Sequence, residues 1–122
     1  MLLKDELTEL LLKIGETNLN PSDLFTEEKP SLFLPEGRTI YLEDYYYYIV
    51  SVERGKINSE KKFENKEDIL YYLLQSYVIR IASKKAWTNA NRDFELYGTL
   101  FEEEQIRLFS IIDPKYGERR RK

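Results

Sequence analysis

The sequence predicts a small α+β protein in which an antiparallel sheet of three to four strands packs against about three helices. Residues 45–53 form an aromatic and apolar run that is typical of a strand and ends at an Arg-Gly turn. Two later stretches, residues 69–81 and 94–112, carry apolar side chains at helical spacing. With 122 residues, of which 42% are hydrophobic, the chain fits one domain spanning residues 1–122.

The first third of the chain is expected to contain a helix, a long connection and two short strands. Leucines at helical spacing over residues 3–14 predict an amphipathic helix, and Gly15 is a suitable C-cap. Residues 16–30 are rich in polar residues and proline, which indicates a surface connection in which a short helix could follow Pro21. Residues 31–34 and 39–42 are strand-like runs on either side of a Pro-Glu-Gly-Arg turn.

A hairpin follows these two strands. A two-residue turn at Arg54-Gly55 is expected because Gly55 can adopt the positive φ that such turns need, and it would pair Glu53 with Lys56. One face of the hairpin would then be the core face, with Tyr46, Val50, Val52, Ile57 and Phe63. The opposite face, expected to meet water or a partner, would carry Tyr47 opposite Lys62, Ile49 opposite Glu60, and Ser51 opposite Asn58.

The second half of the chain is expected to be helical. Asn65, followed three residues later by Asp68, resembles an N-terminal cap for the most buried helix, and residues 89–91 break its pattern. A last helix runs from about residue 92 to residue 112, where Asp-Pro stops it. Gln105 lies on its apolar stripe, so its amide must be hydrogen-bonded if it is buried. Residues 115–122 are basic and are expected to form a disordered tail.

Composition excludes several classes of function. The net charge of −3 and the isoelectric point near 5.2 disfavour a generally basic nucleic-acid binder. The chain has no cysteine and no histidine, so it has no thiol nucleophile and lacks the commonest general base and metal ligand. No signal peptide is recognisable, and the longest apolar run is shorter than the ~20 residues of a membrane span. We therefore expect a cytoplasmic protein with no membrane segment, no metal and no cofactor.

No catalytic constellation is recognisable. Carboxylates are adjacent at residues 27–28, 43–44 and 102–104, but no third polar group recurs beside them at fixed spacing. Such runs are usually solvated faces. The chain also has no calcium-binding loop and no glycine-rich phosphate loop. We therefore predict no catalytic residues.

The tyrosines offer a candidate interaction surface, because Tyr, Trp and Arg dominate the binding energy of protein interfaces. Tyr46 and Tyr48 are expected in the core. For Tyr45 and Tyr47, contact with a partner and burial under another part of the chain are equally favoured. Trp87 suits the edge of the core better than a contact. The candidate partner-binding residues are Tyr45, Tyr47, Ile49, Glu53, Arg54 and Glu60.

Several short motifs occur in a familiar order. The aromatic strand ends in Glu-Arg-Gly at residues 53–55, a helix begins with Lys-Glu-Asp-Ile-Leu-Tyr-Tyr at residues 66–72, Asn-Arg-Asp follows at residues 91–93, and Gln-Ile-Arg-Leu at residues 105–108. From roughly residue 35 onward, this order resembles immunity protein family sixty-three of bacterial polymorphic toxin systems. The positions that match the polar pattern of this family are Glu53, Arg54, Arg92, Asp93 and Gln105.

The resemblance implies a cytoplasmic, non-catalytic α+β protein that binds a cognate toxin domain and blocks its activity. An acidic surface with aromatic residues would suit a nuclease toxin, because nucleases need basic surfaces to hold phosphates. The alternative is a nucleic-acid-binding adaptor, in which the tyrosine strand stacks bases and the basic tail holds phosphates. A small enzyme that uses carboxylates only is the least favoured hypothesis.

Overall fold

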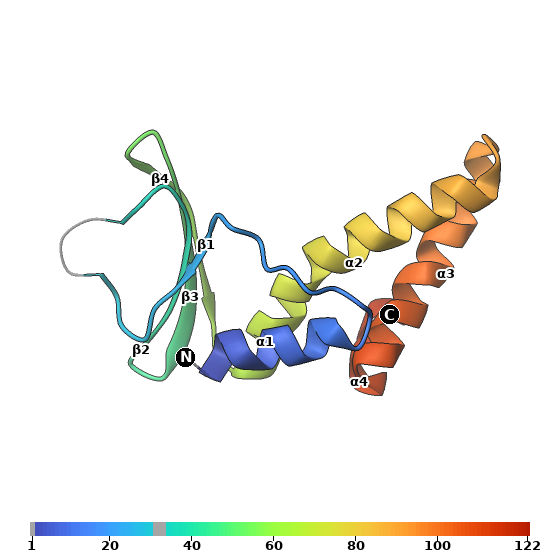
Figure 1. Ribbon diagram of the computed structural model, residues 1–122. Helices are drawn as coiled ribbons and strands as arrows, with labels where there is room; N and C mark the ends of the chain where they lie inside the picture. Colours follow the sequence, from blue (N-terminus) through green and yellow to red (C-terminus); the bar gives the residue numbers. More distant parts are fainter. Residues whose placement is uncertain (1, 31–33) are drawn as a thin grey trace. The chain divides into compact units, whose positions relative to one another are not determined.

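The computed structural model describes residues 2–30 and 34–122 (Figure 1). The strands are β1 (Asp23–Phe25), β2 (Gly37–Glu43), β3 (Tyr46–Glu53) and β4 (Lys56–Phe63), and the helices are α1 (Leu2–Leu12), α2 (Lys66–Ala90), α3 (Phe94–Ile112) and α4 (Pro114–Arg121). The α+β class is therefore confirmed.

The chain divides into two compact units. The first, here called the sheet unit, contains Met1–Thr8 and Thr17–Leu70. The second, the helical unit, contains Glu9–Glu16 and Tyr71–Lys122. The single domain expected from the sequence stays a prediction.

Helix α1 ends at Leu12, and Gly15 caps it as expected with a φ of +79°. The N–H of Gly15 donates to the carbonyl oxygen of Leu12 (3.1 Å), and the N–H of Glu16 donates to that of Leu11 (3.0 Å). This pair of hydrogen bonds is the Schellman motif, which satisfies carbonyl groups at the end of a helix.

The sheet has the order β1-β2-β3-β4 and is mixed, because β1 pairs in parallel with β2 while the other pairs are antiparallel. The short helix expected after Pro21 is wrong, since β1 begins two residues later. Strand β1 is held by its parallel neighbour β2. In addition to the ladder, the carboxylate of Asp23 in β1 accepts hydrogen bonds from Nε (2.8 Å) and Nη2 (2.7 Å) of Arg38 in β2. The strand expected at residues 31–34 lies outside the described residues at 31–33, and Leu34 belongs to no strand.

Close approach of β1 to β2 depends on Gly37. Its φ is +96°, and a Cβ at this position would lie 2.4 Å from the carbonyl oxygen of Ser22. A larger residue would therefore push the two chains apart and disrupt the start of the parallel pair.

The β3–β4 turn forms as expected, with φ values of +55° at Arg54 and +77° at Gly55. Glu53 pairs with Lys56 and Val52 with Ile57, but a β-bulge follows, which leaves Asn58 unpaired. Beyond the bulge the expected register is wrong by one residue, which exchanges the two faces of β4. Phe63 therefore lies opposite Tyr47 instead of Tyr46, and Glu60 lies opposite Val50 instead of Ile49.

Both faces of β3 are covered. On one face Tyr41, Val50 and Val52 form a buried cluster against which Leu34 and Tyr48 pack. On the other face Ile49 lies opposite Ile40, and these side chains are 2% and 0% exposed. The expectation that the Ile49 face meets water is wrong at this position. Ile57, expected in the core, is 61% exposed near the hairpin tip.

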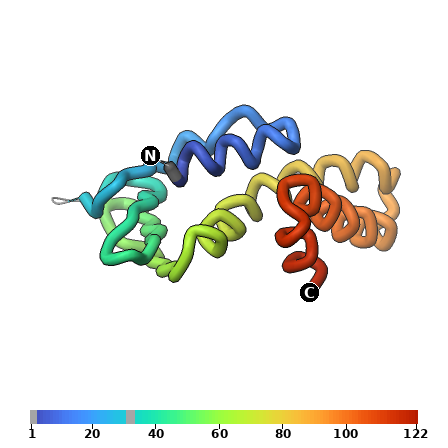
Figure 2. Tube along the Cα trace, turned by 90° about the horizontal axis from the view of Figure 1, so that it is seen from below, coloured from blue at the N-terminus to red at the C-terminus, as the bar shows by residue number. Residues whose placement is uncertain are grey.

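The caps of the two long helices confirm their expected starts. Asn65 Oδ1 accepts a hydrogen bond from the N–H of Asp68 (2.8 Å), so Asn65 caps α2. The chain reverses at Asn91 and Arg92, which adopt φ values of +50° and +70°. Asp93 then caps α3 by accepting from two backbone N–H groups. Figures 1 and 2 show α2 and α3 running side by side after this corner.

The basic segment expected to be a disordered tail forms helix α4. Asp113 caps this helix by accepting from the N–H of Lys115 (2.9 Å), and Pro114 takes the first position, where no N–H is needed. Gly117 lies so close to α3 that a Cβ there would be 1.9 Å from Ser110 Oγ. No helix in the described ranges is long and apolar enough to cross a membrane.

Candidate partner-binding surface

Tyr45 lies outside β3, in the turn that joins it to β2. Asp44 and Tyr45 form this turn with φ values of +51° and +70°, and the Tyr45 side chain is 94% exposed. Such turns favour Asn-Gly or Asp-Gly, because Asn and Asp tolerate a positive φ and glycine adopts it freely, whereas a bulky residue such as tyrosine is strained there. The positive φ of Tyr45 therefore destabilises the folded backbone, and the exposed ring does not compensate by packing in the core.

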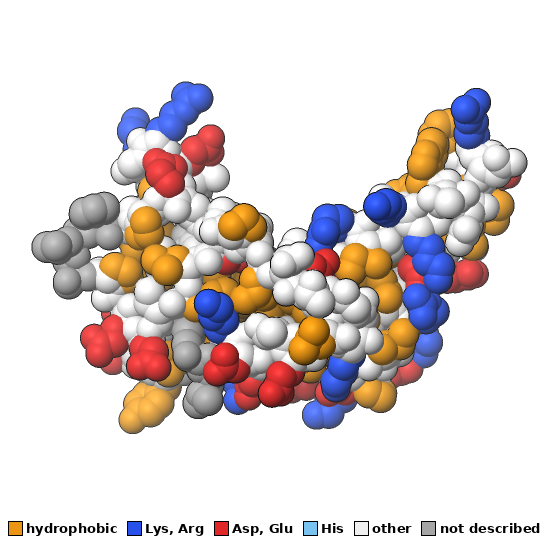
Figure 3. All heavy atoms as spheres, viewed as in Figure 1, with side chains coloured by type: hydrophobic (Ala, Val, Ile, Leu, Met, Phe, Trp, Pro, Cys, Tyr) orange, Lys and Arg blue, Asp and Glu red, His pale blue; other side chains and the backbone are white. Residues whose placement is uncertain are grey.

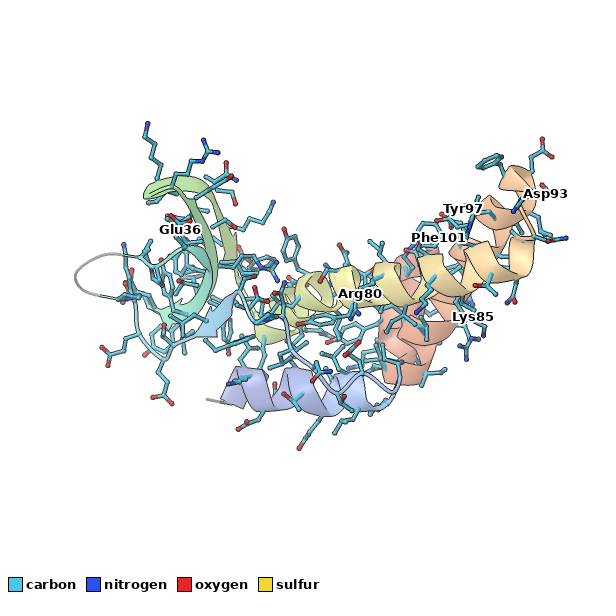
Figure 4. All side chains as sticks on the ribbon, turned by 45° about the horizontal axis from the view of Figure 1, so that its top comes forward. Glu36, Arg80, Lys85, Asp93, Tyr97 and Phe101 are labelled. Carbon is cyan, nitrogen blue, oxygen red and sulfur yellow. The ribbon has the colours of Figure 1, made fainter. Side chains whose placement is uncertain are left out.

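The other candidates do not gather around Tyr45. Glu53 and Arg54 are exposed at the opposite end of the eight-residue strand β3, which puts the two turns roughly 25 Å apart. The β3–β4 turn is held by Glu36, labelled in Figure 4, whose Oε1 accepts the N–H of Gly55 (2.9 Å).

The remaining three candidates are divided between the two faces of the sheet. Tyr47 is half-buried and Ile49 is buried, on the face that carries Ile40. Glu60 is exposed, but the bulge places it on the other face, opposite Val50. The six candidates therefore form no continuous surface, and Ile49 is not accessible to a partner.

A second group of aromatic rings, two of them exposed and two half-buried, lies where α2 meets α3, and sequence reasoning largely missed it. This corner cluster consists of Trp87, Phe94, Tyr97 and Phe101, with centroid distances of 5.6 Å from Trp87 to Phe94 and to Tyr97 and 5.5 Å from Tyr97 to Phe101. Figure 4 shows Tyr97 and Phe101 following Asp93 along α3. Trp87 is 46% exposed and Phe94 is 76% exposed.

The sequence feature that could have indicated this cluster is the position of Phe94 directly after Asp93, the N-cap of α3. A side chain in the first turn of a helix lies at the end of the helix pair, where the partner helix covers it poorly. Helical spacing over residues 94–112 predicts one apolar face but does not show that the first-turn residue Phe94 is left exposed. Trp87, for which the sequence favours the edge of the core over a contact, is among the exposed large hydrophobic residues, so this preference stays a prediction.

Glu104 is a buried carboxylate whose two oxygens are both engaged. Lys85 Nζ lies 2.9 Å from its Oε2, and Arg107 Nε donates to its Oε1. Burial raises the pKa of Glu104, but hydrogen bonds from Arg107 and Lys85 outweigh burial and lower the pKa below its usual value. A carboxylate held charged in this way stabilises the helical unit and is poorly suited to acid-base chemistry.

The buried amide of Gln105 is hydrogen-bonded, as its position requires, because Arg120 Nε donates to its Oε1 (3.1 Å). Arg120 also donates to Glu102, Arg119 stacks over the ring of Tyr71, and Arg121 pairs with Glu118. The arginines that the nucleic-acid hypothesis assigns to phosphates are thus engaged within the chain.

The tyrosine strand is equally unsuited to stacking bases. Tyr48 stacks on Tyr41 with 5.2 Å between ring centroids, and Lys62 Nζ lies 3.9 Å from the ring centroid of Tyr46. Among the described residues, no group of three or more Asp and Glu side chains is arranged to hold a metal ion.

The fold and its surfaces define a class of small α+β protein with exposed aromatic side chains at turns and with buried charges that are paired internally. Residues 43–122 match the family described as Immunity protein 63, and the chain belongs to this family. The resemblance noted in the sequence is thereby confirmed, and immunity proteins are generally non-catalytic toxin inhibitors. Neither curated proteins nor solved structures show a significant match to the chain.

Proposed function

We propose that this protein binds a cognate bacterial toxin domain in the cytoplasm and neutralises it by covering its active surface. Membership of the Immunity protein 63 family supports a toxin as the partner. The observation that carries the choice of surface is Tyr45, which is 94% exposed at a φ of +70°.

A strained and exposed tyrosine is a reason to look for function. A residue with a Cβ in the left-handed region costs roughly 1–2 kcal/mol, and such residues cluster at functional sites. A tyrosine ring offers a large contact area and a polar tip while losing little conformational freedom on binding. The cost at Tyr45 would be offset if the ring anchors a partner.

Neighbouring side chains extend this surface into what we call the turn patch, which consists of Leu42, Asp44, Tyr45 and Tyr47. Leu42 is 40% exposed and lies opposite the half-buried Tyr47 in the β2–β3 ladder. Asp44 is exposed and acidic, as is the chain as a whole with its net charge of −3. Acidic groups around an aromatic anchor favour a basic partner surface of the kind that holds phosphates.

The proposed contact set is accordingly narrower than the one expected from the sequence. Tyr45 and Tyr47 belong to the turn patch, while Glu53, Arg54 and Glu60 are proposed as outlying contacts. Ile49 is left out because it is 2% exposed.

Co-purification tests the proposed function. The tagged protein is expressed together with the product of the gene immediately upstream in its own genome, and the eluted material is analysed by size-exclusion chromatography. We expect one stable complex and loss of the partner's toxicity. Separate elution together with a harmless neighbour would contradict the proposal.

A further inference from the structure

The surface of the helical unit differs in charge from the rest of the chain. Residues 69–92 contain no Asp or Glu but contain four basic residues, Arg80, Lys84, Lys85 and Arg92, in a chain whose net charge is −3. Arg80, Lys84 and Trp87 follow one another at positions i, i+4 and i+7 of α2, so they share one face of this helix. Figure 3 shows Lys and Arg side chains beside hydrophobic ones along this part of the molecule.

Not all of these cations are available to a partner. Lys85 is bound to the buried carboxylate of Glu104, and Arg80 pairs with Glu16 at 2.7 Å. Lys84 and Arg92 are exposed, and within the described ranges neither makes an ion pair. Two cations without an ion pair thus lie close to the corner cluster along the chain: Lys84 three residues before Trp87 on α2, and Arg92 two residues before Phe94 at the reversal between α2 and α3.

The exposed rings beside these cations are held in place before any partner binds. Ser83 Oγ and the hydroxyl of Tyr97 are hydrogen-bonded at 2.8 Å, and the ring of Tyr97 meets Trp87 edge to face at 76°. The ring of Phe94 also packs against Trp87, with 5.6 Å between the ring centroids and 49° between the ring planes. A fixed aromatic surface loses little entropy when a partner docks on it, which favours binding.

We propose that the corner cluster, together with Lys84 and Arg92, docks an acidic segment of a protein partner. Apolar side chains of this segment cover Trp87 and Phe94, and its carboxylates pair with Lys84 and Arg92. This proposal goes beyond the proposed function, because it concerns a surface of opposite charge to the turn patch and does not require the partner to be the toxin.

A peptide fits this surface better than a single-stranded nucleic acid does. Nucleic-acid binding needs a track of cations along the backbone and rings whose faces are free to stack with bases. Of the four cations in residues 69–92, only Lys84 and Arg92 make no ion pair, and the ring of Trp87 is inclined by 49° to that of Phe94 and by 76° to that of Tyr97.

The fluorescence of Trp87 reports on this surface directly, because the chain contains one tryptophan. The full-length protein is titrated with a short peptide of glutamates around a central Leu-Phe pair, with the same peptide carrying lysines in place of glutamates, and with a single-stranded DNA oligonucleotide. We expect a saturable blue shift of the emission with the glutamate peptide only, and an affinity that falls as salt is added.

Charge reversal provides the matched variants. Lys84→Glu should weaken binding of the glutamate peptide at least tenfold, whereas Lys29→Glu, the same change at an exposed lysine of the sheet unit, should leave it unchanged. Both positions are exposed, so circular dichroism should show an unchanged fold. The proposal is overturned if the glutamate peptide causes no shift at millimolar concentration, if DNA binds as tightly, or if Lys84→Glu binds the peptide normally.

Discussion

Thr39 is a polar side chain in the apolar part of the sheet. It is 0% exposed and lies opposite Val50, and its hydroxyl has no hydrogen-bond partner among the described residues. A buried and unsatisfied polar group costs about 1–3 kcal/mol. Replacing the hydroxyl with a methyl group removes this cost while nearly preserving the shape of the side chain.

We therefore expect Thr39→Val to raise the free energy of unfolding by about 1 kcal/mol, measured by urea denaturation. Thr88→Val is the matched control, because that hydroxyl is exposed and donates to the carbonyl oxygen of Lys84 (3.0 Å). The control should show no such gain. A less stable Thr39→Val protein would show that the hydroxyl is satisfied in solution.

Glu104 makes stability depend on pH in the acidic range. Its pKa lies below the usual 4.5 in the folded chain, despite burial, because Arg107 and Lys85 bond to the charged form. A carboxyl with a lowered folded-state pKa contributes stability that is present above the unfolded pKa and is lost as the pH falls through the folded one.

We expect the free energy of unfolding to fall as the pH drops below 4.5, and to fall less steeply in Glu104→Gln. Urea denaturation of both proteins at a series of pH values measures this difference. Parallel pH profiles for the two proteins would rule out the assigned role of the carboxylate.

At the residue scale, the sequence shows which buried polar side chain needs a hydrogen bond better than it shows which residue supplies that bond. The apolar stripe of α3 shows that Gln105 needs a hydrogen bond. It does not show that Arg120 supplies this bond, because the contact depends on α4 turning back along α3. Likewise, the sequence places Tyr45 in the strand, whereas two positive φ values place it in the turn.

Among the elements, α4 depends most on a single position. A Cβ on Gly117 would lie 2.9 Å from Ser110 Cβ and 3.0 Å from Ser110 Cα, so loss of the hydroxyl alone would not make room for it. Gly117→Ala should therefore lower the free energy of unfolding by about 1–3 kcal/mol, although alanine favours helices by about 1 kcal/mol.

The matched test is a double-mutant cycle measured by urea denaturation. Ser110→Gly removes the Cβ that Gly117→Ala would meet, so the double variant should recover part of the lost stability. Gly98→Ala is the control, because nothing lies within 4 Å of a Cβ there, and it should be neutral or stabilising. A stable Gly117→Ala protein would contradict the packing of α4 on α3.

Elements with local signals were predictable from the sequence, and elements held by distant partners were not. Gly55 and Asn65 mark the β3–β4 turn and the start of α2, and both signals act within a few residues. Strand β1 has three residues and depends on β2 and on the Asp23–Arg38 ion pair. The bulge at Asn58 is not visible in the alternation of side chains, so the register and the face of Glu60 were wrong.

At the scale of the whole molecule, the sequence indicates the family but does not show which of the candidate side chains are exposed. The family follows from motifs between Glu53 and Leu108, and residues 43–122 match Immunity protein 63. The candidate surface assumed one uncovered face of the hairpin. Ile49 is buried there, whereas the candidate Tyr45 is exposed, and further exposed aromatic area lies at the α2–α3 corner.

The central claim is that the exposed ring of Tyr45 anchors the toxin. Isothermal titration calorimetry of the purified partner domain against Tyr45→Gly tests it most directly. Glycine suits the left-handed backbone of the turn, so the variant should be at least as stable as the unchanged chain. Asn91→Gly is the matched control, because it makes the same kind of change at another exposed left-handed position, outside the proposed contacts.

We predict that Tyr45→Gly binds the partner at least tenfold more weakly, a loss of about 1.4 kcal/mol or more, while Asn91→Gly binds within a few-fold of the unchanged protein. If Tyr45→Gly binds as tightly as the unchanged protein, the turn patch is not the toxin-binding surface.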